Sequence, residues 1–448
     1  MSPRLFLIVL GVSLGPIAIA IEPPAPQPHE EPRTLTLEAA YDLALATDQT
    51  LAIAYAEARK GALEPASAMT RLLPTITGNA SSNRSDRTGA NRGFTSNLGN
   101  VSGGALTTNQ TSLNLAWPFV DFTLLPAYRR GKLISESSRL EYQAAIRQTL
   151  YSVAAAYFEV LSQQRIVRVS EETLRLAEEN LTIARKRADA GAVTRVDVLR
   201  AQASAEENRR ALIQAENDLI VGRNVLGNLL DLRNRDFTLV DPQSSKAHPA
   251  EDALDGFLVT AFTEREDLKA RELAILQETE RRKEIRAQYA PVVSGQASAS
   301  GTQASGNLNR SDWQAVLAIR FPFVDSGQRA IELKRQGLQV EQSQENYAKF
   351  RETVQEEVTN AFVAVRGLRE TVDALEAQVD AESQAYQDVQ TQYRAGTARS
   401  IDVLDALRTL NNARKDLAVQ IYGYELALKR LDQVTGVLEE ERVRKVAP

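Results

Sequence analysis

The chain has 448 residues, enough for two or three globular domains, but only 6% of them are aromatic. Abundant Ala, Glu, Arg, Leu and Gln with so few aromatics indicates long helices with thin apolar seams rather than thick cores. The net charge of −5 is spread over both signs and gives no basic face, so we exclude nucleic acid as a partner.

Residues 1–20 predict a secretory signal peptide. Arg4 precedes an apolar run over 5–10, and the stretch ends in Ala18-Ile19-Ala20, an A-x-A cleavage pattern. A membrane anchor is the alternative, but glycine and proline interrupt a run that is already short for a span. Residues 21–34 follow as a stiff Pro-rich lead-in. The sequence contains no cysteine, which excludes disulfides and lipid attachment through Cys.

Residues 35–72 predict helix, with a break at Asp48-Gln49. Pro74 stops the helix, and alternation of polar with small or apolar residues predicts a strand over about 75–83. The Asn, Gly, Ser and Thr of 84–108 predict a mobile loop. A second strand is expected over about 111–117 and ends at Pro118.

From about Asp121 to Ala190 the three-four spacing of apolar residues predicts one helix of roughly 100 Å at 1.5 Å per residue. Gly191 marks the tip of a hairpin, and a return helix runs over about 194–230. Residues 35–230 therefore form a first repeat. The prolines of 231–250 indicate an irregular linker.

Residues 251–436 repeat the same pattern. Phe321-Pro-Phe-Val-Asp325 matches Trp117-Pro-Phe-Val-Asp121, and strands are expected over about 292–300 and 312–321. A second long helix ends at Gly396, and Ser400 is the expected N-cap of its return helix. Gly396 with Asp402-Val-Leu corresponds to Gly191 with Asp197-Val-Leu. The chain is thus a duplicated coiled-coil hairpin, followed by a C-terminal tail over 437–448.

The strands alternate between an apolar and a polar face, which indicates a membrane β-barrel. Aromatic residues near the strand ends are expected to anchor the membrane interface, with core positions as the alternative. These residues are Trp117, Phe119, Trp313, Phe321 and Phe323. Four strands cannot close a barrel, because about eight are the minimum and open edges in lipid leave unpaired amides. The chain must then oligomerise; a soluble β-hairpin capping a helical bundle is the alternative.

The duplicated unit, Leu72-Leu73-Pro74, and Tyr393-Arg-Ala-Gly396 followed by Asp402-Val-Leu-Asp405 resemble the TolC family of outer-membrane efflux proteins. The resemblance covers nearly all of the mature chain. It implies a mainly α fold with a membrane β-barrel: a homotrimer that builds one 12-stranded barrel, continued by a periplasmic α-helical barrel. It also implies an outer-membrane duct of a tripartite efflux or type I secretion system, with a periplasmic adaptor and an inner-membrane pump as partners and outer-membrane lipid around the barrel.

For the tips, the resemblance implies a latch of Asp197, Tyr393 and a basic residue; Ala398 stands at the family's basic position, and Arg399 follows it. It further implies a pore-lining acidic ring of Asp402 and Asp405. Helix capping is the alternative for all three aspartates, and Thr194 to Asp197 reads as a capping box.

Catalytic chemistry is not expected in this chain. The sequence has no nucleophile-base pairing and no phosphate-binding Gly loop with Lys, so we do not expect an enzyme or a cofactor. His29 and His248 lack Cys or acidic partners at ligand spacing, so no metal site is expected. The alternative function is a soluble periplasmic coiled-coil scaffold without a pore, and the cargo is not specified by the sequence.

Overall fold

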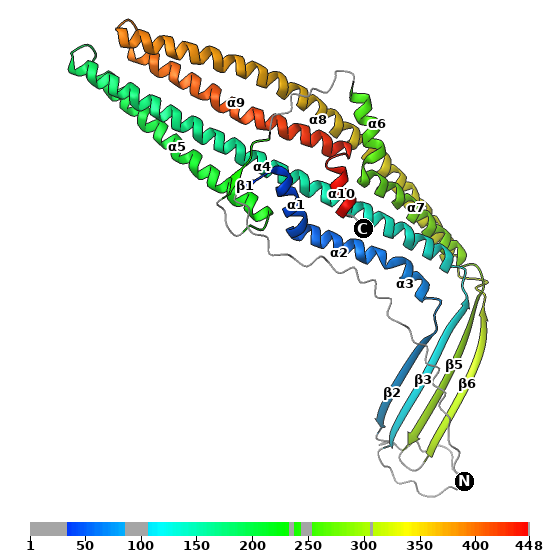
Figure 1. Cartoon of the computed structure of the whole chain (residues 1–448). Coiled ribbons are helices and arrows are strands. Elements are labelled where there is room, and N and C mark those ends of the chain that lie inside the picture. The colour runs from blue at the N-terminus through cyan, green and yellow to red at the C-terminus, as the bar shows by residue number, and fades with distance from the viewer. Residues whose placement is uncertain (1–33, 86–105, 233–236, 243–252, 305–307, 447–448) are drawn as a thin grey trace, which may run out of the picture.

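The computed structural model describes residues 34–85, 106–232, 237–242, 253–304 and 308–446. The predicted signal peptide, the lead-in up to residue 33 and most of the predicted loop over 84–108 lie outside these residues. Figure 1 shows a long helical body with a β-sheet at one end and the tips of helical hairpins at the other.

The same order of elements occurs twice along the chain. The first half contains β1 (Thr34–Leu35), α1 (Leu37–Thr47), α2 (Gln49–Ala62), α3 (Glu64–Thr70), β2 (Thr75–Ser85), β3 (Leu106–Val120), α4 (Leu124–Asp189) and α5 (Arg195–Leu229). The second contains β4 (Thr238–Leu239), α6 (Leu254–Glu264), α7 (Glu266–Ala287), β5 (Val292–Ala304), β6 (Leu308–Arg320), α8 (Gln328–Ala395), α9 (Ser400–Thr435) and α10 (Glu440–Val446). With 66 and 68 residues, α4 and α8 each extend on the order of 100 Å.

The break between α1 and α2 falls at Asp48, where it was expected. Its backbone is extended, and its carboxylate accepts a hydrogen bond of 2.6 Å from the Thr50 amide. The side chain therefore caps α2.

Two expectations about element ends were wrong. β3 continues past Pro118 to Val120, and its register with β5 shifts at this point, because a bulge accommodates a residue that has no amide N–H. The N-cap of α9 is Arg399, and Ser400 is its first, buried residue. The segment expected as a C-terminal tail contains α10, whose Val443 is only 1% exposed.

The expected linker over 231–250 is also partly regular. Its β4 pairs in parallel with β1. The hydroxyl of Tyr157 on α4 donates to the carbonyls of Leu35 and Val240 at 2.9 and 2.6 Å. This buried tyrosine therefore fixes the small two-stranded sheet to the long helix.

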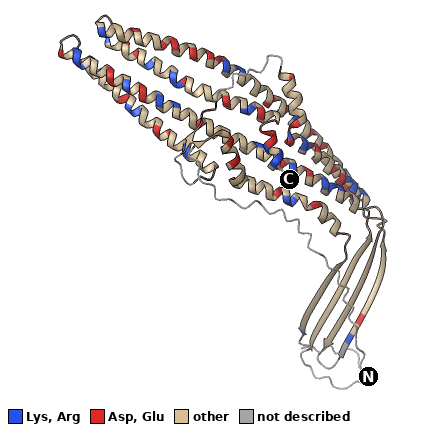
Figure 2. Cartoon of the chain, in the orientation of Figure 1, with Lys and Arg blue, Asp and Glu red and all other residues tan. Residues whose placement is uncertain are grey.

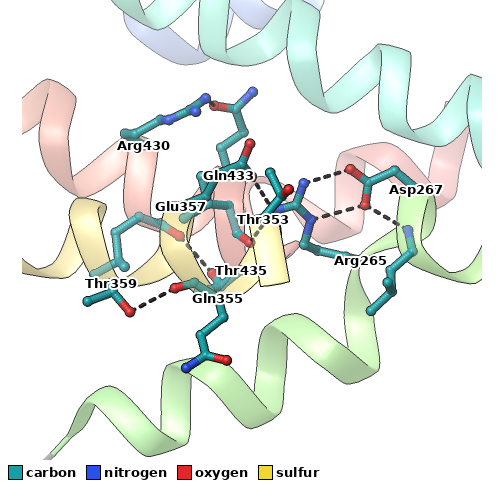
Figure 3. Close-up of polar contacts among 12 residues, drawn as sticks. Arg265, Asp267, Thr353, Gln355, Glu357, Thr359, Arg430, Gln433 and Thr435 are labelled. Atoms are coloured by element: carbon teal, nitrogen blue, oxygen red, sulfur yellow. Dashed lines mark hydrogen bonds and ion pairs between the residues drawn. The ribbon is translucent and has the colours of Figure 1, made fainter. Parts of the chain in front are cut away.

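A largely buried arginine joins three helices of the second half in the middle of the helical body. Arg265, at the start of α7, donates to Asp267 at 2.7 and 3.0 Å, to Glu357 on α8 at 2.6 Å and to the Val434 carbonyl on α9 at 3.3 Å (Figure 3). Burial opposes its charge, but the hydrogen bonds to Asp267 and Glu357 outweigh burial and raise the pKa of Arg265. These contacts hold α7, α8 and α9 together.

The close approach of α3 to α4 requires glycine at position 131. A Cβ atom there would lie 2.9 Å from backbone atoms of Glu64 and Pro65. We expect Gly131→Ala to destabilise the protein by about 1–3 kcal/mol, because α3 would have to move. Gly367→Ala on α8 is the matched control: a Cβ meets nothing within 4 Å there, so we expect stabilisation of about 0.5–1 kcal/mol. Chemical unfolding followed by circular dichroism measures both, and equal effects would contradict the packing argument.

Candidate functional site

The four long strands form one antiparallel sheet in the order β2-β3-β5-β6, and its two faces differ in chemistry. The register places apolar or small residues side by side on one face; one such row is Gly78, Leu113, Ala299 and Trp313. The adjoining row on the other face is polar: Asn79, Ser112, Ser300 and Asp312. Leu317 and Trp313 on the apolar face are 70% and 82% exposed. A broad exposed apolar face of this kind marks a membrane or protein contact.

The five predicted interface aromatics all lie on the surface rather than in the core. Trp117 and Phe119 contact each other with ring centroids 4.8 Å apart, and Phe321 and Phe323 at 4.5 Å, all at the helical end of the sheet. Trp313 lies farther along β6, roughly 26 Å from Phe321 at 3.3 Å per residue. That separation is close to the apolar band of about 25 Å in an outer-membrane barrel.

Gly191 and Gly396 form the hairpin tips at the far end of the helical body (Figure 1). Both have left-handed backbones, with φ of 74° and 91°. The Thr397 amide donates to the Gln392 carbonyl at 2.9 Å, and the Ala192 amide donates to the Arg187 carbonyl at 2.8 Å. Each glycine therefore ends a long helix in the way left-handed glycines do.

The three predicted site aspartates make local contacts within their own hairpins. Asp197 accepts from the Thr194 hydroxyl at 2.7 Å and from its amide at 3.0 Å, which completes the capping box. These hydrogen bonds lower the pKa of Asp197 in the folded protein. The contribution of Asp197 to the free energy of unfolding is therefore fully present above the pKa of the unfolded chain, and it is lost as the pH falls through the lowered pKa.

Asp402 accepts hydrogen bonds from the Arg399 side chain at 3.0 Å and from its amide at 3.0 Å. These bonds, led by the side-chain bond, lower the pKa of Asp402. Asp405 pairs with Arg408 at 3.4 Å. The structure thus brings Arg399 to Asp402, and places a second arginine beside Asp405 that the sequence interpretation did not include.

Tyr393 lies inside the tip, only 2% exposed. Arg187 of α4 donates to its carbonyl, and the guanidinium lies 4.6 Å from the centroid of its ring. Within the chain, Tyr393 is thus held by Arg187, while Asp197 is engaged by Thr194.

The contacts that join the two hairpins near the tips were missed by sequence reasoning. The Asn180 amide donates to the Tyr386 hydroxyl at 3.1 Å, one heptad from the contact between Arg187 and Tyr393. Glu179 pairs with Arg394 beside them. The sequence does contain a sign of these contacts. Asn180 and Arg187 on α4 are seven residues apart, as are Tyr386 and Tyr393 on α8, which is the heptad spacing of residues that face a partner helix.

We expect Arg187→Ala to loosen the contact between the hairpins. The variant loses a charged hydrogen bond, of about 1.5–3 kcal/mol before screening in this partly exposed site, and a cation–π contact of about 0.5–1 kcal/mol. Amide hydrogen exchange over 386–396 should accelerate about tenfold or more. Arg185→Ala, an exposed neighbour, is the control; equal exchange in both variants would show that Arg187 does not hold the tip.

Within the parts of the chain that the structure describes, no helix is long and apolar enough to cross a bilayer. Over the same residues, no group of three His, Cys, Asp or Glu side chains could hold a metal ion. The two histidines considered in the sequence, His29 and His248, lie outside the described residues.

A two-faced antiparallel sheet continued by very long helical hairpins defines the class of outer-membrane efflux channels. The family profile described as "Outer membrane efflux protein" matches residues 40–230 and 258–437. The chain belongs to this family, and the resemblance to TolC-like proteins is confirmed. It is an outer-membrane efflux channel with a large periplasmic part.

Individual proteins agree with this assignment. The chain is 25% identical over 335 residues to the cation efflux system protein CusC of Escherichia coli, covering 71% of each chain. It is 25% identical over 289 residues to the probable efflux pump outer membrane protein TtgC of Pseudomonas putida, covering 64% of this chain and 59% of the relative. The fold matches the Campylobacter jejuni CmeC outer membrane channel with a TM-score of 0.76 at 18% identity, covering 92% of this chain and 89% of that one.

Proposed function

We propose that three copies of the chain form one passive exit duct. The observation that carries this proposal is the four-stranded sheet: among the residues that the structure describes, its outer strands β2 and β6 each have a partner strand on one side only. Open edges in lipid leave unpaired amides, which cost several kcal/mol each. Three copies would close twelve strands into a barrel, with apolar faces toward lipid and polar faces toward the lumen. The aromatics at both ends of the apolar face would anchor this barrel at the membrane interfaces.

The helical body then continues the lumen as a tunnel, and the hairpin tips are its far end. Efflux channels of this family act in pumps, so we propose that the tips contact a periplasmic adaptor that links the duct to an inner-membrane pump. The duct itself performs no chemistry in this proposal. Relatives that are equally similar are named for cations and for toluene, so the cargo is not carried over from them.

We also propose two roles for the tip residues in the assembled duct. Asp402 and Asp405 line its narrow end as an acidic ring, and Asp197, Tyr393 and Arg399 hold the tips closed as a latch. The exposed ion pairs of both ring aspartates with arginines leave their carboxylates accessible. The latch requires Tyr393 to turn, because its hydroxyl is now buried without a hydrogen-bond partner among the described residues.

Planar-bilayer recordings test this function. Purified protein should insert and give stepwise currents, and both Tyr393→Phe and Asp197→Ala should raise conductance or its noise by loosening the latch. A soluble scaffold would stay in the aqueous fraction without detergent and give no currents. Channels with unchanged traces in both variants would support the duct and contradict the latch.

A further inference from the structure

Exposed basic side chains gather where the helices meet the sheet. Figure 2 shows Lys and Arg concentrated over this end of the helical body. Each lies within about two turns of the helix end nearest the sheet. We call six of them the basic collar: Arg129 and Lys132 on α4, Arg282 and Arg286 on α7, and Lys334 and Arg335 on α8, all exposed.

Four acids of this layer are already paired with basic side chains. Glu284 is 4% exposed and pairs with Arg71, Arg130 and Arg281 at 3.5, 3.5 and 2.9 Å. Three other acids are paired as well: Asp325 with Arg329, Glu332 with Arg335 and Glu280 with Lys283. Apart from Arg335, the collar side chains make no ion pair with any residue that the structure describes. The layer therefore carries uncompensated positive charge on its surface.

An exposed apolar or aromatic side chain lies between the collar and the sheet on α4, on α8 and in the turn just after α7. Leu125 is 57% exposed, Ile331 63% and Tyr289 41%. A collar residue follows three or four positions farther from the sheet, on the same side of the helix. The pairs are Leu125 with Arg129, Ile331 with Lys334 and Tyr289 with Arg286. An apolar residue followed by a cation is the order of contacts at a membrane surface, from acyl chain to headgroup.

We propose that the basic collar binds anionic phospholipid headgroups in the leaflet on the helical side of the membrane. This inference rests on the proposed function, because it requires the sheet to lie in the bilayer. The headgroup region extends roughly 5–8 Å beyond the hydrocarbon. Arg286 lies one residue before the sheet end of α7, and Arg129 lies about 8 Å along the axis from the sheet end of α4 at 1.5 Å per residue. Arginine binds phosphate oxygens through paired N–H donors, and lysine adds charge. The collar thus selects the phosphate of a negatively charged lipid and fixes the depth of the channel.

Native mass spectrometry of the full chain in lipid discs tests the collar. One disc contains phosphatidylethanolamine with phosphatidylglycerol and the other phosphatidylethanolamine with phosphatidylcholine. The unmodified protein should retain phosphatidylglycerol at least about tenfold over phosphatidylcholine. The collar variant, which carries Arg129→Gln, Lys132→Gln, Arg282→Gln and Arg286→Gln, should lose this preference to within about twofold. The control carries Arg185→Gln, Arg195→Gln, Arg200→Gln and Arg210→Gln, an equal charge change far from the sheet, and should keep the preference.

A collar variant that keeps the preference, or an unmodified protein that has none, would overturn the inference. Loss of the preference on adding millimolar inorganic phosphate would show a free-anion site and would also overturn it. If the glutamine variant does not fold, Arg129→Lys, Arg282→Lys and Arg286→Lys keep the charge and should weaken the preference only in part; complete loss there would count against charge recognition. A protein that enters neither disc would contradict the proposed function itself, whereas entry without lipid preference would contradict only the collar.

Discussion

Arg147→Ala should destabilise the protein by roughly 3–5 kcal/mol, the cost of leaving a buried charge without its partner. Arg147 on α4 is 4% exposed and donates through two nitrogens to Glu266 at the start of α7, which is 9% exposed. It also donates to the Leu438 carbonyl at 2.8 Å. Removing the side chain leaves both Glu266 and this carbonyl unsatisfied between the two halves of the chain.

Arg139→Ala is the control, because its pair with Glu136 is exposed on the same helix and should contribute at most about 1 kcal/mol. The double variant Arg147→Met with Glu266→Leu should recover most of the stability, since it removes both charges from the interior. Denaturant midpoints of the detergent-solubilised protein, followed by helical circular dichroism, compare all three. A midpoint for Arg147→Ala equal to that of Arg139→Ala would show that the buried pair adds nothing.

The largest functional effect is expected from Asp402→Asn combined with Asp405→Asn. In three copies these residues place six carboxylates at the narrow end of the proposed duct, and a trivalent cation gains more from them than a monovalent one. The unmodified channel should be cation-selective and blocked by trivalent cations from the periplasmic side. The double variant should lose at least about tenfold in block. Folding and assembly should persist, because an asparagine side-chain oxygen at position 402 can still accept the hydrogen bond that the Arg399 amide donates.

The salt dependence of the block, measured in the same recordings, distinguishes a pore-lining role of these aspartates from a purely structural role at the start of α9. Block should weaken as the Debye length falls from about 10 Å at 0.1 M to about 3 Å at 1 M. Asp218→Asn, an exposed change on α5 far from the tip, should leave block intact. Undiminished block in the double variant would mean that these aspartates only begin α9, as the bonds between Asp402 and Arg399 already do in the single chain.

The sequence predicted the elements well because their signals are periodic and local. The three-four spacing gave α4 and α8, alternation gave the four strands, and Gly191 and Gly396 are glycines at left-handed positions. Pro118 misled the strand prediction, since a proline ends a regular ladder but fits a bulge, and bulges depend on the partner strand.

Local sequence patterns do not show which residues of the two hairpins contact each other. Arg187 and Tyr393 meet across 206 positions, and which turn of α4 faces which turn of α8 depends on how the two hairpins pack. The same holds for Arg147, whose long charged side chain reads as a surface residue in the sequence but lies between α7 and the residues before α10. The partners of Asp402 and Asp405 could have been predicted from the sequence, because Arg399 and Arg408 are each three residues away, at the N-cap of α9 and on α9.

In the proposed duct, strands β2 and β6 are edges that other copies of this chain complete. Native mass spectrometry of the detergent-solubilised protein measures this directly. In the proposed barrel three copies supply twelve strands, so the dominant species should have three times the mass of one chain and should not dissociate on dilution. A stable, folded monomer with the same helical content would contradict the closed barrel, and with it the duct.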